Sequence, residues 1–288
     1  MERATDAIRA CVEKARRHRP VKSKFIATQA CRAAENGAEF LAKVRKDLGI
    51  SLQAITGKQE AKFALMGSLD LIDPEKRFAA VIDIGGGSTE VCFVDARAAV
   101  SRGVKGCAAR PPILGWASFP FGVVTLTESF ASRGPDAYTA MVEHVSQQLE
   151  ANDAASRFGP LFTDGRGQLI GNSGTVTSLT AVSLNLPKYI RAAVDGVWID
   201  RNAASAASQR LVTATSEERA REPCIGPERA DLIVAGCAIL DAIWNVWPAE
   251  RMRVGDRGLR EGMLMSMIHE PKRTNGRASG QRRKKAGS

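Results

Sequence analysis

An acidic residue stands at each end of a glycine-rich segment, Asp83-Ile84-Gly85-Gly86-Gly87-Ser88-Thr89-Glu90. Three consecutive glycines can present backbone N–H groups to an anion without obstruction by side chains, and the two hydroxyl residues that follow add donors. The flanking carboxylates, Asp83 and Glu90, are hard oxygen ligands that could hold a divalent cation beside a phosphate. The pattern favours a phosphate-binding loop with a metal site over an ordinary glycine-rich hairpin.

A second glycine-containing segment reads Gly171-Asn172-Ser173-Gly174-Thr175. It joins a predicted strand at 169–172 to a helix that continues to Val182, and the N-terminus of a helix attracts anions. We expect phosphate contacts from Gly171, Ser173, Gly174 and Thr175. Two phosphate-binding turns that face each other across a cleft are the arrangement of actin-like ATPase folds.

The elements that must position these residues alternate between strands and helices. Short strands are expected at 24–28 and 50–55, with helices at 29–48 and 60–71, and this βαβα order indicates an α/β layer structure. An apolar hairpin of strands 78–84 and 88–94 should carry the first loop. Further along, we expect irregular chain at 96–115, strands at 116–119, 123–126 and 251–254, and helices at 136–149, 201–213, 228–246 and 257–268.

Composition and charge exclude several classes of protein. The chain has 288 residues, 44% of them hydrophobic, with six Cys and three His. Its charged N-terminus is not a secretory signal, and no apolar run is long enough for a membrane span. No C-x-x-C pair or zinc-ligand spacing occurs, so buried thiols in a reducing cytoplasm are expected. The net charge of +10 is concentrated at the termini, and residues 271–288 carry seven Lys/Arg without an acid.

Five segments in order resemble those of the exopolyphosphatase / guanosine pentaphosphate phosphohydrolase (Ppx/GppA phosphatase) family. They are Ala27–Asn36 (ATQACRAAEN), Gly57–Ala61 (GKQEA), Asp83–Glu90, Gly171–Thr175 and Gly258–Gly262 (GLREG). The CRAAENG stretch and the basic tail are similar to the alphaproteobacterial branch. The resemblance implies an α/β, actin-like ATPase (ribonuclease H-like) fold of two domains. It also implies a cytoplasmic, Mg²⁺-dependent enzyme that removes the terminal phosphate from inorganic polyphosphate or pppGpp.

The same resemblance implies roles for single residues. Glu60 would activate the attacking water, Arg32 would contact phosphate, and Asp83 and Glu90 would lie at the metal. These roles suit the chemistry, because hydrolysis of a phosphoanhydride needs charge neutralisation, in-line positioning and an oriented water. Without the resemblance, Glu60 would be interpreted as an acidic residue that stabilises the N-terminus of its helix. Arg32 would be interpreted as an exposed residue of a helix.

One motif of the family is missing from this sequence. Family members open with a strand–turn–strand of the form A-x-D-x-G-S/T-N, which supplies the first phosphate loop. We therefore expect residues 1–77 to be the remnant of an N-terminally truncated first domain, with helix 257–270 packing back on it. Residues 78–256 would form the second domain and 271–288 a disordered basic tail. An exposed sheet edge would favour a homodimer, and activity would be impaired.

Other functions remain open at this stage. The chain could be a non-catalytic protein that binds phosphorylated ligands, or an actin-like kinase, although Glu60 and the Arg32 segment do not suit those kinases. The tail could bind polyanions or simply be a solvated terminus. Specific nucleic-acid binding is not expected, because the middle of the chain is slightly acidic and only 6% of residues are aromatic. The sequence does not choose between polyphosphate and pppGpp.

Overall fold

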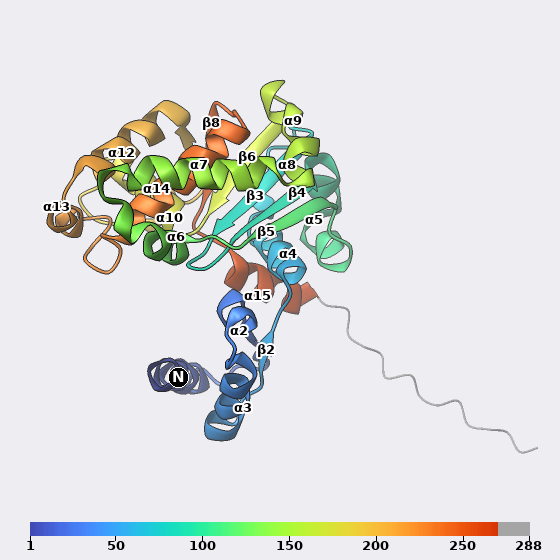
Figure 1. Ribbon diagram of the computed structural model, residues 1–288. Coiled ribbons are helices and arrows are strands. Elements are labelled where there is room, and N and C mark those ends of the chain that lie inside the picture. The colour runs from blue at the N-terminus through green and yellow to red at the C-terminus, as the bar shows by residue number, and fades with distance from the viewer. Residues whose placement is uncertain (270–288) are drawn as a thin grey trace, which may run out of the picture.

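The computed structural model of the chain describes residues 1–269 (Figure 1). The strands are β1 (Phe25–Ala27), β2 (Leu52–Ala54), β3 (Phe78–Ile84), β4 (Thr89–Asp95), β5 (Ile113–Phe119), β6 (Gly167–Asn172), β7 (Trp198–Asp200) and β8 (Arg251–Gly255). A parallel two-stranded sheet contains β1 and β2, and a six-stranded sheet has the order β5-β4-β3-β6-β8-β7. The predicted tail at 271–288 lies outside the described residues.

Helices cover both faces of the larger sheet. The helices of the described chain are α1 (Glu2–Arg17), α2 (Gln29–Ala33), α3 (Gly37–Leu48), α4 (Gly57–Gly67), α5 (Ala96–Ala109), α6 (Val123–Phe130), α7 (Ala137–Glu150), α8 (Asp153–Phe158), α9 (Pro160–Thr163), α10 (Gly174–Ser183), α11 (Arg191–Val194), α12 (Arg201–Thr213), α13 (Ser216–Arg221), α14 (Leu232–Val246) and α15 (Leu259–His269), of which α1, α2 and α3 lie with the small sheet. Two 3₁₀ turns span Leu69–Leu71 and Ala131–Asp136. Within residues 1–269, no helix has the length and apolar content needed to cross a bilayer.

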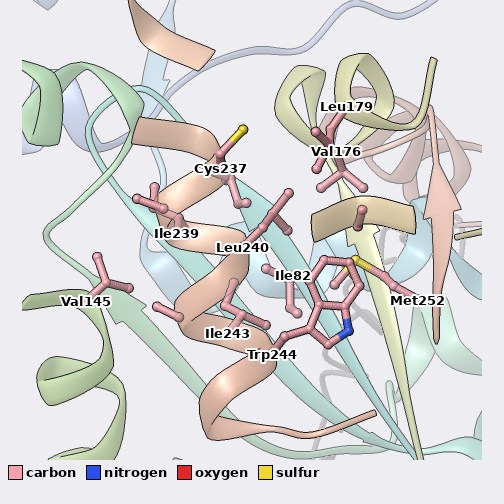
Figure 2. Packing of buried hydrophobic residues seen from close by; sticks show 14 of the residues in the cluster. Ile82, Val145, Val176, Leu179, Cys237, Ile239, Leu240, Ile243, Trp244 and Met252 are labelled. Carbon is pink, nitrogen blue, oxygen red and sulfur yellow. The ribbon is translucent and has the colours of Figure 1, made fainter. Parts of the chain in front are cut away.

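The alternation of side chains along β3 divides the core into two layers. Ile82 and Ile84 point to the face covered by α14, where Ile239, Leu240 and Ile243 pack against the sheet (Figure 2). Ala79 and Val81 point to the opposite face, which is covered by α4 and α5. Because successive side chains in a strand face opposite ways, Asp83 belongs to the α4 face.

The segment before β3 leads from the small sheet to the large one. Figure 1 shows α4 and α15 between the six-stranded sheet and the part of the chain that contains α1, α2 and α3. Helices α4 and α15 cross in close contact, because Gly262 lies against the Phe63 carbonyl and Gly67 against the Gly258 carbonyl. The final helix thus packs on a helix of the 1–77 segment.

Three expected elements differ in the structure. The helix predicted at 29–48 is interrupted after Ala33, because Ala34 takes an extended conformation. The segment predicted as irregular at 96–115 contains α5 and the start of β5, and the Asp95 side chain caps α5 by accepting from Ala98 N at 2.8 Å. The strand predicted at 123–126 is helical, as α6.

Candidate active site

The glycine segment forms the turn of the β3–β4 hairpin. The strands are antiparallel, and Gly85 N donates to Ser88 O at 2.8 Å to close the turn. The carbonyls of Gly85 and Gly86 accept hydrogen bonds from the first N–H groups of α6, at 2.8–3.2 Å. Within residues 1–269, the Gly86, Gly87 and Ser88 N–H groups have no backbone acceptor. The turn is therefore anchored through its carbonyls and keeps these donors for another acceptor.

Asp83 and Glu90 face each other across the hairpin. They are paired Cα partners in the antiparallel register, so both side chains lie on the face that α4 covers. Ser118 of β5 donates to Glu90 Oε1 at 3.0 Å. Burial, together with the charges of Glu90 and Glu60, raises the pKa of Asp83 to about 7. Burial also raises the pKa of Glu90, and hydrogen bonds from Ser88 and Ser118 oppose this shift.

Glu60 lies in the first turn of α4, whose start is fixed by a capping box. The Thr56 hydroxyl accepts from Gln59 N at 3.3 Å, and the Gln59 side chain accepts from Thr56 N at 2.9 Å. Gly57 at the start of the helix lies against Ser118, the residue that also contacts Glu90. Burial and the charge of Glu90 raise the pKa of Glu60, and its pair with Arg32 opposes the shift.

Arg32 holds Glu60 in place. Its Nη2 lies 2.6 Å from Glu60 Oε2 and 2.9 Å from Gln29 Oε1, and its Nη1 donates to the Ile55 carbonyl at 2.5 Å. Gln29 in turn lies against Gly87 of the glycine turn. The sequence predicted a phosphate contact for Arg32, whereas in the structure its guanidinium binds the carboxylate of Glu60.

The second glycine segment is the junction of β6 and α10. Ser173 has a φ of 110°, a conformation that L-residues rarely adopt, and its hydroxyl is buried without a hydrogen-bond partner in the described chain. Such strain persists only where the surrounding structure enforces it, and it is common at ligand sites. Gly174 and Thr175 follow in the first turn of α10. The junction thus places an unpartnered, buried hydroxyl directly before the N-terminus of α10.

Both glycine segments border one pocket. A cavity of about 160 Å³ is lined by residues of the two segments, with α6 and α14 at its sides: Ile84, Gly85, Gly86, Val123, Gly174, Thr175, Arg229, Leu232 and Ile233. The structure therefore brings together two parts of the chain that the sequence separates widely. A cavity with free N–H donors, a helix N-terminus and an arginine is suited to phosphate.

Two predicted phosphate ligands lie elsewhere. Gly171 is buried within β6, where a Cβ would overlap Met252, so its lack of a side chain serves packing. The Thr89 hydroxyl is buried and donates to the Phe121 carbonyl at 2.9 Å. These two expectations are corrected, because Gly171 and Thr89 are both buried and neither is accessible to a ligand.

Comparison with known proteins agrees with this geometry. The signature of the Ppx/GppA phosphatase family matches residues 1–271. The chain belongs to this family. The resemblance inferred from five short segments is thereby confirmed across the described fold.

Solved structures of Ppx/GppA proteins have the same fold. A crystal structure of the Aquifex aeolicus family member is 25% identical, covers 93% of this chain and 80% of its own, and superposes with a TM-score of 0.72. An exopolyphosphatase-like protein is 26% identical, with coverages of 92% and 83% and a TM-score of 0.78. An exopolyphosphatase from Cytophaga hutchinsonii, 21% identical, has coverages of 92% and 80% and a TM-score of 0.74. The expected α/β, actin-like fold is confirmed.

The number of carboxylates available in this Ppx/GppA protein suits a magnesium ion. Among the described residues, no three His, Cys, Asp or Glu side chains are arranged as a complete metal site. Mg²⁺ commonly takes only one or two carboxylates from the protein and fills its other positions with water and substrate phosphates. Asp83 and Glu90 supply such a pair, and a cation would offset the burial and the repulsion from Glu90 that together raise the pKa of Asp83.

Arg229 is a site residue that the sequence did not reveal. It lies between α13 and α14, donates through Nη1 to Ser178 Oγ at 3.1 Å and lies against Gly174. Its guanidinium therefore borders the pocket beside the second glycine segment. The surrounding sequence, Glu228-Arg229-Ala230-Asp231, carries no motif that indicates a phosphate contact. Only the fold brings it to the site.

Proposed function

We propose that this chain hydrolyses the terminal phosphoanhydride bond of inorganic polyphosphate or pppGpp, with Glu60 as the residue that activates water. Membership of the Ppx/GppA phosphatase family supports the reaction class. The observation that carries the proposal is the gathering of three carboxylates, Glu60, Asp83 and Glu90, on one side of the first glycine segment, whose Gly85 and Gly86 also border the pocket shared with the second segment. Phosphate chemistry explains why acids and anion-binding turns should share one site.

Each part of the site has a task in this proposal. The free N–H groups of the β3–β4 turn, the N-terminus of α10 and Arg229 would bind the phosphate oxygens. Asp83 and Glu90 would hold Mg²⁺, which when bound neutralises the charge on the phosphates. Helix α6 is hydrogen-bonded to the carbonyls of Gly85 and Gly86 and closes that side of the turn. The leaving phosphate chain would therefore extend in the opposite direction, away from α6.

Glu60 and Arg32 would control the water. The contacts of Arg32 with Glu60, Gln29 and the Ile55 carbonyl fix the orientation of the carboxylate. One oxygen of Glu60 would accept a hydrogen bond from the attacking water and align it with the bond to be broken. The raised pKa of Glu60 suits this task, because a more basic carboxylate is a better proton acceptor while it is ionised.

The test is Glu60→Gln, assayed by phosphate release from polyphosphate and from pppGpp in the presence of Mg²⁺. We expect turnover to fall by roughly 10²–10⁴-fold, the usual contribution of a positioned base, while substrate binding is retained. Glu39→Gln, at an exposed position of α3, is the matched control and should leave turnover unchanged.

Undiminished turnover in Glu60→Gln would remove Glu60 from the mechanism. Binding of polyphosphate by the unaltered protein without release of phosphate would instead support a non-catalytic binding protein. Transfer of phosphate to an acceptor other than water would support a kinase.

A further inference from the structure

A second cavity, separate from the candidate active site, lies where α14 packs against both α7 and α12 (Figure 1). It has a volume of about 270 Å³, and its lining includes Tyr138 and Val142 of α7, Arg201 of α12, and Asp241, Trp244 and Asn245 of α14. The other end of α14 lines the active-site pocket through Leu232 and Ile233. Asp241 follows Ile233 by roughly two helical turns, or about 12 Å along the axis, so the two cavities are distinct.

Asp241 provides the negative charge of this cavity. Its half-buried carboxylate accepts a hydrogen bond through Oδ2 from the Tyr138 hydroxyl at 2.5 Å. Burial and this hydrogen bond raise the pKa of Tyr138, so the phenol stays protonated and acts as the donor. Burial also raises the pKa of Asp241, and the hydrogen bond from Tyr138 opposes that shift. Within residues 1–269, no lysine or arginine forms an ion pair with Asp241.

Arg201 provides the positive charge. It is the first residue of α12 and is half-buried, and its Nη2 donates to Asn245 Oδ1 at 2.8 Å. Asn245 lies four residues after Asp241, so both side chains project from the same face of α14. A guanidinium has five N–H donors. In the described part of the chain, the bond to Asn245 is the one side-chain hydrogen bond that Arg201 makes, so donors remain for a further acceptor.

The two charges line one cavity without meeting. The guanidinium of Arg201 and the carboxylate of Asp241 lie farther apart than ion-pair distance, and each is held by a neutral side chain of another helix. They are nevertheless close enough to interact, because the charge of Arg201 lowers the pKa of Asp241. Opposite charges that are held apart in one cavity suit a small molecule that carries both complementary charges. An α-amino acid carries its ammonium and carboxylate groups on the same carbon atom.

The rest of the lining limits the kind of molecule that fits. Val142 and Trp244 are its apolar residues, and they suit an apolar side chain. The volume is below the roughly 300–1,000 Å³ of sites for drug-sized ligands, so the ligand is small. A phosphate ester would suit Arg201 but would carry no cation for Asp241, whose charge would repel it. The cavity therefore favours a zwitterion over the phosphorylated ligands expected at the active site.

We propose that this cavity binds a free α-amino acid with an apolar side chain, whose carboxylate contacts Arg201 and whose ammonium group contacts Asp241. The Tyr138 hydroxyl and the Asn245 amide would hold the two charged groups in position before the ligand arrives. Two charge-assisted contacts at fixed positions give such a site its selectivity, because a molecule with one charge satisfies only one of them. The inference does not depend on the proposed hydrolase activity.

The test compares ligands that differ by one charged group. Isothermal titration calorimetry near neutral pH measures the binding of L-phenylalanine, of 2-phenylethylamine, which lacks the carboxylate, and of 3-phenylpropanoate, which lacks the ammonium group. L-leucine with 3-methylbutylamine and 4-methylpentanoate forms a second set with a smaller side chain. Each set is titrated into the unaltered protein, Asp241→Asn and Arg201→Gln. The matched controls are Asp6→Asn and Arg45→Gln, at exposed positions on α1 and α3, away from α14 (Figure 1).

We expect at least one of the two amino acids to bind the unaltered protein more tightly than either of its analogues. Asp241→Asn should raise the Kd of that amino acid about 10- to 100-fold, because a hydrogen bond between charged groups is lost. It should not weaken binding of the analogue without an ammonium group. Arg201→Gln should weaken the amino acid to a similar extent and leave the amine analogue unchanged. The control variants should bind all ligands as the unaltered protein does.

Three results would overturn the inference. The first is that neither L-phenylalanine nor L-leucine binds the unaltered protein. The second is that each amino acid and its two analogues bind equally well, because recognition would then not depend on both charges. The third is a loss of affinity in Asp241→Asn or Arg201→Gln that is equal for all three ligands of a set. That result would show that the residue supports the packing of the helices, and circular dichroism of each variant verifies that it is folded.

Discussion

Gly86 and Cys92 belong to the same hairpin but have opposite surroundings. Gly86 is exposed at the turn, and a Cβ there would make only ordinary contact with Val124, so a larger residue fits the fold. Cys92 is buried in β4 under α4, where burial raises the pKa of its thiol to about 12 and keeps it neutral. The turn position is open to ligand, and the strand position serves packing.

We therefore expect Gly86→Val to abolish most phosphate binding with little loss of stability, because the added methyl groups block the approach to the free N–H donors. Cys92→Ala should keep phosphate affinity and lose about 1–2 kcal/mol of unfolding free energy. Isothermal titration with tripolyphosphate and urea unfolding measure the two effects. Unchanged affinity in Gly86→Val would contradict the assignment of the turn.

The sequence could predict residues that carry their own local signal. Asp83 and Glu90 flank a triple glycine, and Glu60 follows a helix start, so their approximate places could be predicted from nearby residues. Arg229 could not, because its role depends on α14 lying beside α10. The partner of Arg32 was also missed, since only the folded arrangement brings its guanidinium to Glu60 at 2.6 Å.

At the scale of elements, expectations failed where tertiary contacts outweighed local preference. The residues of α5 include two glycines, Gly103 and Gly106, and Gly103 interrupts the helical conformation with a φ of 57°, yet the Asp95 cap and the burial of Ala99 and Cys107 hold the segment helical on either side. The start of α6 is rich in β-branched residues, which favour strands. It is helical because its first N–H groups bind the carbonyls of the glycine turn.

The crossing of α4 and α15 depends on two small residues, Gly67 and Gly262. A Cβ at Gly262 would overlap the Phe63 carbonyl and come within 2.9 Å of Gly67 N. We expect Gly262→Ala to push the helices apart and cost about 2–3 kcal/mol of unfolding free energy, as overpacking commonly does. Because Glu60 lies on α4, turnover should fall as well.

Thermal unfolding and phosphate release measure these two effects. Leu264→Ala is the matched control on the same helix, since its side chain is 54% exposed and its loss should change neither quantity. A Gly262→Ala protein as stable and as active as the unaltered one would show that the crossing is not a tight constraint on the site.

At the scale of the whole molecule, three acids gather at one end of the large sheet. Glu60, Asp83 and Glu90 lie where β3 meets β4, and Arg32 lies with them, paired with Glu60. Burial raises the pKa of all three groups, and repulsion from neighbouring carboxylates adds to the shift for Glu60 and Asp83. The free energy of unfolding should therefore respond to pH and to divalent cations.

The raised pKa of Asp83 sets the direction in which stability changes with pH. Its pKa is about 7 in the folded protein, against 3.8 for an ordinary aspartate. The folded state thus binds a proton more tightly than the unfolded chain, so the stabilisation is present below about pH 4 and is lost as the pH rises to about 7. In chelator, the unaltered protein should lose about 1–2 kcal/mol of unfolding free energy across this window, a value reduced from the full shift because Asp83 is only half-buried.

Asp83→Asn removes the titrating group while keeping its shape, so the variant should become the more stable of the two as the pH rises toward 7. Mg²⁺ should raise the melting temperature of the unaltered protein near neutral pH, because a cation bound to the folded state relieves the repulsion that the lost proton leaves behind. The variant should gain less.

Asp136→Asn, at an exposed position before α7, is the matched control and should follow the unaltered protein in both measurements. If the melting temperatures of Asp83→Asn and of the unaltered protein change with pH in the same way, the charge of Asp83 does not destabilise the folded state. If Mg²⁺ raises both melting temperatures equally, Asp83 is not part of a cation site.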